Sequence, residues 1–170
     1  MRFSDECFRL YESFIERVFA YQRVRRLFTN RWSLAQLIAF HSAHKLQIMA
    51  HSPVAYSELG RLVARAKSLP RAQLREQYEG TFMDALCISA TRRRQTNVLQ
   101  HMAGYFKRDL DDASRQELAT LIDDYRRALV PLVVPLTLIR HYVRRFGVSY
   151  LDGQVYLQPH PKELMLRNHV

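Results

Sequence analysis

The sequence predicts a mainly α, single-domain helical bundle of about seven helices spanning residues 1–170. Its length, 170 residues and 20.1 kDa, corresponds to one domain with one sizeable core. Apolar residues make up 48%, with only 5 Gly and 6 Pro, which is typical of a globular chain. Apolar side chains also recur at helical spacing between helix-start signals. We therefore expect helices at 7–28, 34–50, 53–67, 70–90, 96–107, 114–129 and 131–146.

The first two helices are predicted from the spacing of apolar residues and from one N-cap residue. Phe14, Val18 and Tyr21 lie three or four residues apart, as on one face of a helix. Ser33 is a typical N-cap residue, so the second helix is expected to begin directly after it.

Prolines indicate where three further helices begin. Proline is favoured at the first helical position because the amide that it lacks has no intrahelical partner there. Pro53, after Ser52, and Pro70 start the third and fourth helices, and Pro131 starts the last one. Pro135 is compatible with that helix only within its first turn.

Two elements of the second half are predicted from polar signals. The helix at 96–107 is expected to begin at Thr96, after the basic run 92–94. Ser114 and Glu117 form a capping-box pattern for the helix at 114–129.

The end of the chain carries a turn signal. The pair Asp152-Gly153 lies between β-prone residues, a pattern typical of a two-residue turn. We expect a small C-terminal hairpin at 150–157.

The charge balance points to a polyanionic partner. The chain carries 26 basic and 16 acidic residues, for a formal charge of +10. Among the basic residues, 22 are Arg and only 4 are Lys. The planar arginine fork matches phosphate and stacks on bases, whereas a basic surface needed only for solubility could use lysine equally well. A merely solvated basic face is the alternative.

The predicted phosphate contacts lie in two helices. The 92–94 run precedes a helix N-terminus, where the partial positive charge of the helix favours anions. In the last helix, basic residues lie opposite the apolar face of Leu136, Ile139 and Val143. The arginines expected to contact phosphate are Arg92, Arg93, Arg94, Arg140, Arg144 and Arg145.

The helix at 34–50 carries polar residues on its apolar face. Leu37, Ile38, Ile48 and Met49 define that face. His41 and Lys45 fall within it and His44 at its edge, while Gln47 falls on the opposite face. A buried ammonium needs an anion or a route to water, so Lys45 either extends to solvent or binds a carboxylate or ligand. His41 is either a hydrogen-bonded core histidine or part of a site.

No cofactor or metal is predicted. The spacing of His41 and His44 permits a shared ion, but no carboxylate lies between Arg17 and Glu58 and no HExxH pattern occurs. Nucleophile-elbow, P-loop and GxGxxG motifs are also missing. Cys7 and Cys87 are too few for a zinc ribbon or an iron–sulfur cluster.

The expected location is the cytoplasm. Charges occur throughout the first residues, where a secretory signal needs an apolar core, and no apolar stretch is long enough to cross a bilayer. No membrane partner is expected.

Four strings together resemble the YbgA family. They are RVFAYQRVRRLF (17–28), LIAFHSAHKLQIMAHSP (37–53), TRRRQTNVLQHMAGYFKR (91–108) and PLVVPLTLIRHYVRRF (131–146). The resemblance covers residues 14–168. Two positions depart from the family's pattern, because Ala128 stands where Gly is expected and Ala43 where a basic residue is expected.

The resemblance implies a role in RNA binding. The family is a domain of unknown function that occurs alone or on the C-terminal side of a thiouracil or 4-thiouridine desulfidase domain, where it looks like the part that holds the tRNA. The three cluster-binding cysteines of the desulfidase are missing here, so that chemistry is not assigned to this chain. The residues implied to line a nucleotide or phosphate pocket are His41, His44, Lys45, Asn97, His101, Tyr105 and His141.

We therefore expect an RNA-binding accessory domain, most readily for tRNA, linked to sulfur removal from thiolated uridine. Its other expected partner is a separate desulfidase domain or protein. This interpretation assigns the chain no catalysis of its own. Two alternatives stay open: an enzyme of nucleotide or modified-base metabolism that uses His41 and Lys45 as catalytic residues, and a protein-interaction module.

Overall fold

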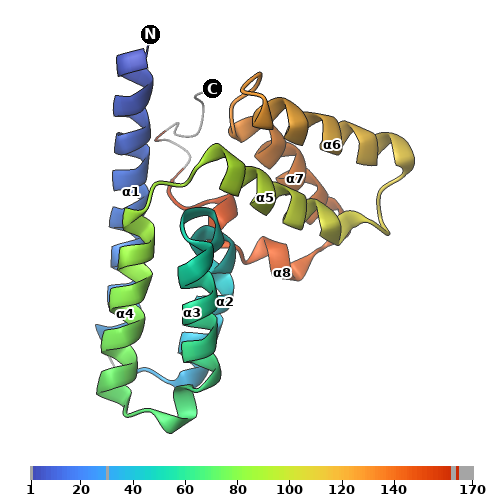
Figure 1. Ribbon diagram of the computed structural model, residues 1–170. Coiled ribbons are helices and arrows are strands. Elements are labelled where there is room, and N and C mark those ends of the chain that lie inside the picture. The colour runs from blue at the N-terminus through green and yellow to red at the C-terminus, as the bar shows by residue number, and fades with distance from the viewer. Residues whose placement is uncertain (1, 30, 162–163, 165–170) are drawn as a thin grey trace. The chain divides into compact units, whose positions relative to one another are not determined.

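The structure is a computed structural model that describes residues 2–29, 31–161 and 164 (Figure 1). It confirms the all-α class, with eight α-helices and no strand in these ranges. The helices form two compact units, Met1–Ala90 and Thr91–Val170. The single-domain organisation over 1–170 stays a prediction.

The first unit contains four long helices. They are α1 (Arg2–Thr29), α2 (Leu34–His51), α3 (Pro53–Ala64) and α4 (Arg71–Cys87), with a 3₁₀ turn at Ala66–Ser68. Helix α4 packs against each of the other three, and α2 packs against α1 and α3 (Figure 1). Helix α2 thus has neighbours on several sides.

Local signals start two of these helices as predicted. The Ser33 side chain accepts a hydrogen bond from the Gln36 amide, and the Gln36 side chain accepts one from the Ser33 amide. Ser52 caps α3 by accepting from the Ala55 amide, and Pro53 occupies the first turn. Both caps satisfy amides that have no partner within the helix.

Aromatic rings fill the core of the first unit. Tyr78 and Phe82 of α4 are fully buried, with stacked rings whose centroids lie 6.1 Å apart. Phe28 of α1 meets Tyr78 edge-on at 6.4 Å. Burying each such ring contributes about 1.5–3 kcal/mol. This aromatic cluster therefore joins α4 to α1.

The second unit is built on three helices. They are α5 (Arg92–Ala103), α6 (Asp112–Arg126) and α7 (Val133–Phe146), followed by the short α8 (Ser149–Asp152) and 3₁₀ turns at Gly104–Phe106 and Val155–Leu157. Helices α5, α6 and α7 pack against one another, and α8 packs on α7. Their shared core includes the buried residues Val98, Leu99, Met102, Phe106, Leu118, Ile122, Leu136 and Ile139.

Several helix starts differ from the predicted residues. Helix α1 begins at Arg2 and not at residue 7, and α7 begins at Val133, two residues after Pro131.

Helices α5 and α6 both begin earlier than predicted. Helix α5 begins at Arg92, because Thr91 caps it by accepting from the Arg94 amide. The basic run therefore lies in the first turn of α5 and not before it. Helix α6 is capped by Asp111, which accepts from the Ser114 amide, so Ser114 lies inside the helix. In both cases an earlier capping side chain extends the helix by several residues.

The expected hairpin at 150–157 is also wrong. Residues 149–152 form α8, and residues 155–157 form a 3₁₀ turn. The two-residue turn of a hairpin requires left-handed backbone, whereas Gly153 has φ −78°. Its amide instead donates to the carbonyls of Ser149 and Leu151, so the pair Asp152-Gly153 ends a helix.

Candidate functional site

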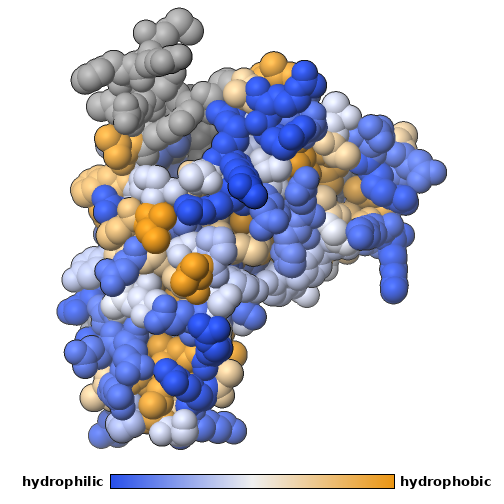
Figure 2. Space-filling model, in the orientation of Figure 1, coloured by the Kyte–Doolittle hydropathy of each residue, from blue (hydrophilic) through white to orange (hydrophobic). Residues whose placement is uncertain are grey.

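The basic surface of the second unit lies on α5 and α7. Neither helix contains an acidic residue, and together they carry six arginines. Acidic side chains gather on α6 instead, where Asp123 bonds Arg126 at 2.8 Å and lies 3.8 Å from Arg127. Figure 2 shows strongly hydrophilic side chains over the N-terminal end of α5 and the adjoining end of α6.

The six predicted phosphate contacts differ in accessibility. Arg93, Arg144 and Arg145 are exposed, whereas Arg94 and Arg140 are half-buried. The guanidinium of Arg145 also lies 5.2 Å from the centre of the Phe146 ring. The exposed arginines come from both helices, one near the start of α5 and two in the last turn of α7.

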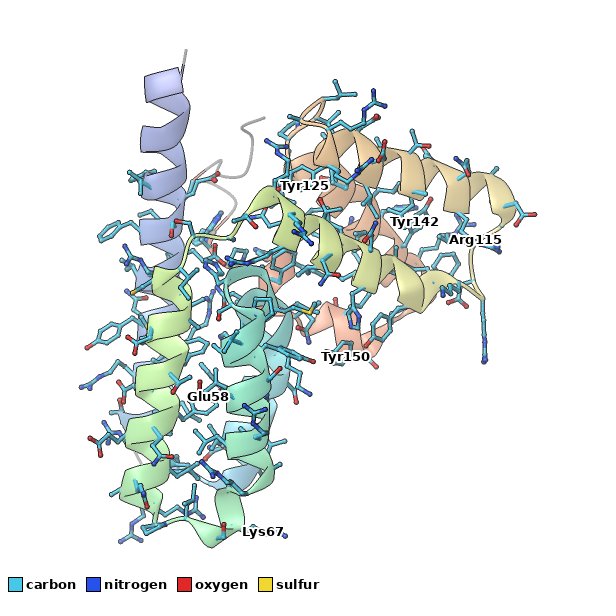
Figure 3. The ribbon with its side chains drawn as sticks, viewed as in Figure 1. Glu58, Lys67, Arg115, Tyr125, Tyr142 and Tyr150 are labelled. Atoms are coloured by element: carbon cyan, nitrogen blue, oxygen red, sulfur yellow. The ribbon has the colours of Figure 1, made fainter. Side chains whose placement is uncertain are left out.

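Arg92 has a different role in the structure. Its Nη1 donates to the Tyr125 carbonyl at 2.8 Å, and its guanidinium carbon lies 4.9 Å from the centre of the Tyr125 ring. The Tyr125 hydroxyl in turn donates to Gln95 Oε1. Figure 3 labels Tyr125 beside the N-terminal end of α5. Arg92 thus ties α5 to α6.

The four other predicted site residues of this unit are all exposed. Asn97 and His101 lie on α5, Tyr105 in the turn that follows, and His141 on α7. The His101 and Tyr105 rings meet edge-on at 5.7 Å. The His141 ring lies 5.6 Å from that of its chain neighbour Tyr142.

Tyr150 of α8 is not among the predicted pocket residues, although the sequence places it among aromatic residues interleaved with basic ones, of which one or two were expected to stack on bases. Its ring stacks on Tyr105 with centroids 5.2 Å apart and planes 17° apart. The sequence analysis missed this contact because it expected a hairpin at 150–157. A strand directs its side chains differently from a helix. The signal that could have indicated it is the aromatic content of residues 150–157, which include Tyr150 and Tyr156.

The predicted histidines of the first unit are buried. His41 and His44 are each 3% exposed, whereas Lys45 is half-buried. His41 Nδ1 forms a 3.1 Å hydrogen bond with the Tyr78 hydroxyl, and His44 Nδ1 donates to the Phe40 carbonyl at 2.7 Å. Both Nδ1 atoms are thus committed within the fold.

Burial keeps these imidazoles neutral. It lowers the pKa of His41 to about 4, with a smaller contribution from the charge of Lys45. It also lowers the pKa of His44 to about 4, against the opposing hydrogen bond to Phe40. Burial likewise raises the pKa of Tyr78, so its hydroxyl keeps the proton.

Gln47 is another buried polar residue of α2, close to His41 and His44 in the sequence, although the sequence analysis placed it on the opposite, solvent-facing side of the helix. It is fully buried, and its Nε2 donates to Glu16 Oε1 at 2.8 Å. His51 Nδ1 donates to the Ile88 carbonyl at 2.6 Å, while its Nε2 lies 3.6 Å from Glu16 Oε1. We call His41, His44, Gln47, His51 and Glu16 the polar track.

The prediction of a single buried stripe on α2 was wrong because α1, α3 and α4 surround that helix. Ile38, which was assigned to the buried stripe, is instead 49% exposed. Three buried atoms of the polar track, His41 Nε2, His44 Nε2 and Gln47 Oε1, have no hydrogen-bond partner among the residues that the structure describes. Within the described residues, no three His, Cys, Asp or Glu side chains come together as a metal site.

The predicted pocket draws on both units. His41, His44 and Lys45 belong to the first unit, and Asn97, His101, Tyr105 and His141 to the second. A pocket that joins them stays a prediction, as does a catalytic role for His41 and Lys45.

The first unit also has an open surface hollow of about 410 Å³, lined by Trp32, Arg71, Ala72, Arg75, Glu76 and Glu79. Arg71 lies over the Trp32 ring at 4.8 Å, and Arg75 lies 3.5 Å from Glu79. Since both signs of charge line it, the hollow is not suited to a polyanion.

The described helices include none with the length and apolarity to span a membrane. The described helices define a class of protein: an all-α protein with two packed, arginine-rich helices that contain no acidic residue, and with a buried polar track.

The chain belongs to the family described as "Protein of unknown function (DUF1722)", whose model matches residues 45–161. It is 36% identical over 158 residues to the Escherichia coli (strain K12) protein named "Uncharacterized protein YbgA", covering 92% of this chain and 94% of that protein. This match confirms the resemblance to the YbgA family. No solved structure matches the chain.

Proposed function

We propose that this protein binds RNA, with tRNA as its substrate class, through arginines of α5 and α7. The observation that carries the proposal is the distribution of charge: both helices are acid-free, and Arg93, Arg144 and Arg145 are exposed on them. Such cations neutralise phosphates and release counterions, so they supply affinity without reading sequence.

The link to thiolated uridine comes from the family resemblance. On this proposal the chain holds tRNA in the cytoplasm, while a separate desulfidase domain or protein removes the sulfur. The chain contributes position and affinity, not the bond-breaking step.

The test is a fluorescence-anisotropy titration with bulk tRNA at several salt concentrations. The variant changes Arg93, Arg144 and Arg145 to Ala, and we expect weaker binding with a salt slope smaller by about 2 to 3. The charge-matched control changes Arg61, Arg65 and Lys67, which are exposed in the first unit, to Ala. Salt-independent binding, or equal loss in both triple variants, would refute the proposal.

Exposed apolar side chains on α1 support a second function, protein interaction. Leu10 is 62% exposed and Phe14 is 53% exposed, one turn apart. Isolated exposed apolar residues are common, but neighbouring ones are typical of contact surfaces. Changing both to Ser should abolish co-elution with a desulfidase protein while leaving tRNA affinity unchanged; unchanged co-elution would exclude this role.

A further inference from the structure

The stacked pair Tyr105 and Tyr150 is a preformed aromatic surface at the far end of the basic helix α5. The two rings come from different elements, the turn after α5 and the short helix α8, yet they lie nearly parallel at 5.2 Å. Tyr105 remains 40% exposed. A ring of this size that stays open to solvent while stacked on a second ring offers a flat apolar surface.

Local contacts hold the pair in position. The buried side chain of Gln154 donates to the Tyr150 carbonyl at 3.3 Å, across the turn that ends α8. His101 meets the edge of Tyr105 one helical turn earlier. Figure 3 labels Tyr150 below the C-terminal half of α5. The surface therefore requires little ordering when a ligand arrives, which lowers the entropic cost of binding.

Exposed polar and charged residues lie near Tyr105 along the chain, and they are of the types that bind a nucleotide. The exposed Asn97 lies one turn before His101 on α5, and its amide can both donate to and accept from a base edge. Lys107 and Arg108 are exposed directly after the Tyr105 turn. An aromatic face flanked by cations is the combination that binds unpaired bases together with their phosphates.

We propose that Tyr105, stacked on Tyr150, is a base-stacking site for an unpaired RNA base. Arg93 lies about 18 Å from Tyr105 along the helix at 1.5 Å per residue, so a single strand of a few nucleotides reaches from the arginines to the stacked rings. The inference rests on the proposed RNA binding and narrows it to single-stranded or loop segments, since both faces of a base inside a duplex are stacked on the neighbouring base pairs.

The experiment uses the full chain and a short single-stranded RNA that contains 2-aminopurine, whose emission falls when it stacks. A fully paired RNA duplex of the same sequence serves as the comparison. We expect quenching and tighter binding with the single strand. Tyr105→Ala should weaken single-strand binding roughly 5- to 100-fold and abolish the quenching, with the salt slope unchanged.

Three further variants control for folding and for aromatic loss in general. Tyr105→Phe keeps the ring and should bind like the wild type, whereas Tyr105→Leu keeps apolar packing and should behave like Tyr105→Ala. Tyr21→Ala removes a 49% exposed tyrosine from the first unit and should have no effect.

The outcomes separate the two proposals. Salt-dependent binding that does not change when Tyr105 is replaced would overturn the stacking site and leave the proposed RNA binding intact. Equal affinity for the single strand and the duplex would do the same. Quenching that depends on Tyr105 without any salt dependence would support the stacking site and overturn the arginine surface. No binding of either RNA would overturn both.

Discussion

Ala128 occupies a backbone conformation that favours glycine, and replacing it with Gly should stabilise the protein. Its φ is +65°, in the left-handed region. The Leu129 amide donates to the Asp124 carbonyl at 2.9 Å and the Ala128 amide to the Tyr125 carbonyl at 3.1 Å. These are the two hydrogen bonds of the Schellman motif that ends a helix, in which glycine is the usual residue at this position.

The expected gain follows from two opposing contributions. A left-handed L-residue costs about 1–2 kcal/mol, which Gly relieves. Gly also gives the unfolded chain more freedom, which costs about 0.4–1 kcal/mol. Ala128→Gly should therefore raise the free energy of unfolding by about 0.5–1 kcal/mol. For a chain of this size the melting temperature should rise by roughly 1–4 °C, measured by circular dichroism or calorimetry.

Two glycines serve as controls with opposite signs. Gly147 ends α7 at φ +62°, and no atom lies within 4 Å of the place that a Cβ would take, so Gly147→Ala should lower the melting temperature through backbone strain alone. Gly80 lies inside α4 with open space around it. Gly80→Ala should therefore raise the melting temperature by about as much as Ala128→Gly does, because alanine is the better helix former. A lower melting temperature for Ala128→Gly, or a higher one for Gly147→Ala, would refute the reasoning.

Three further predictions concern stability. Because the pKa values of His41 and His44 are about 4 in the fold and about 6.5 when unfolded, the unfolded chain binds more protons between these values. The free energy of unfolding should therefore be highest above pH 6.5 and decline toward pH 4, by up to roughly 3 kcal/mol per histidine. Denaturant titrations across this pH range measure the decline, and a free energy that does not change with pH would contradict the prediction. Ser33→Ala removes the capping box and should cost about 1 kcal/mol in the same assay, whereas no loss would show that the cap is dispensable. Arg92→Ala should cost about 1–2 kcal/mol because it breaks the contact with α6, whereas Arg93→Ala should stay within about 0.5 kcal/mol, and equal effects would place both arginines in the same role.

Much of the fold could be predicted because its signals are local. Ser33, Ser52 and Pro53 act within a few residues of themselves, so their effect on the helix starts is readable from the chain. Competition between neighbouring caps was harder to judge. Thr91 and Asp111 precede the predicted starts and extend α5 and α6, because any capping side chain that reaches a free amide lets the helix begin earlier.

The sequence by itself determined the all-α class, the basic character of α5 and α7 and the burial of His41, since composition, spacing and caps depend on near neighbours. Only the tertiary structure decided that Gln47 is buried, that Arg92 bonds to α6, and that Tyr150 stacks on Tyr105. These outcomes depend on which elements surround a helix and on contacts between residues tens of positions apart. Periodicity identifies the faces of one helix, but packing determines which of those faces meet protein and which meet water.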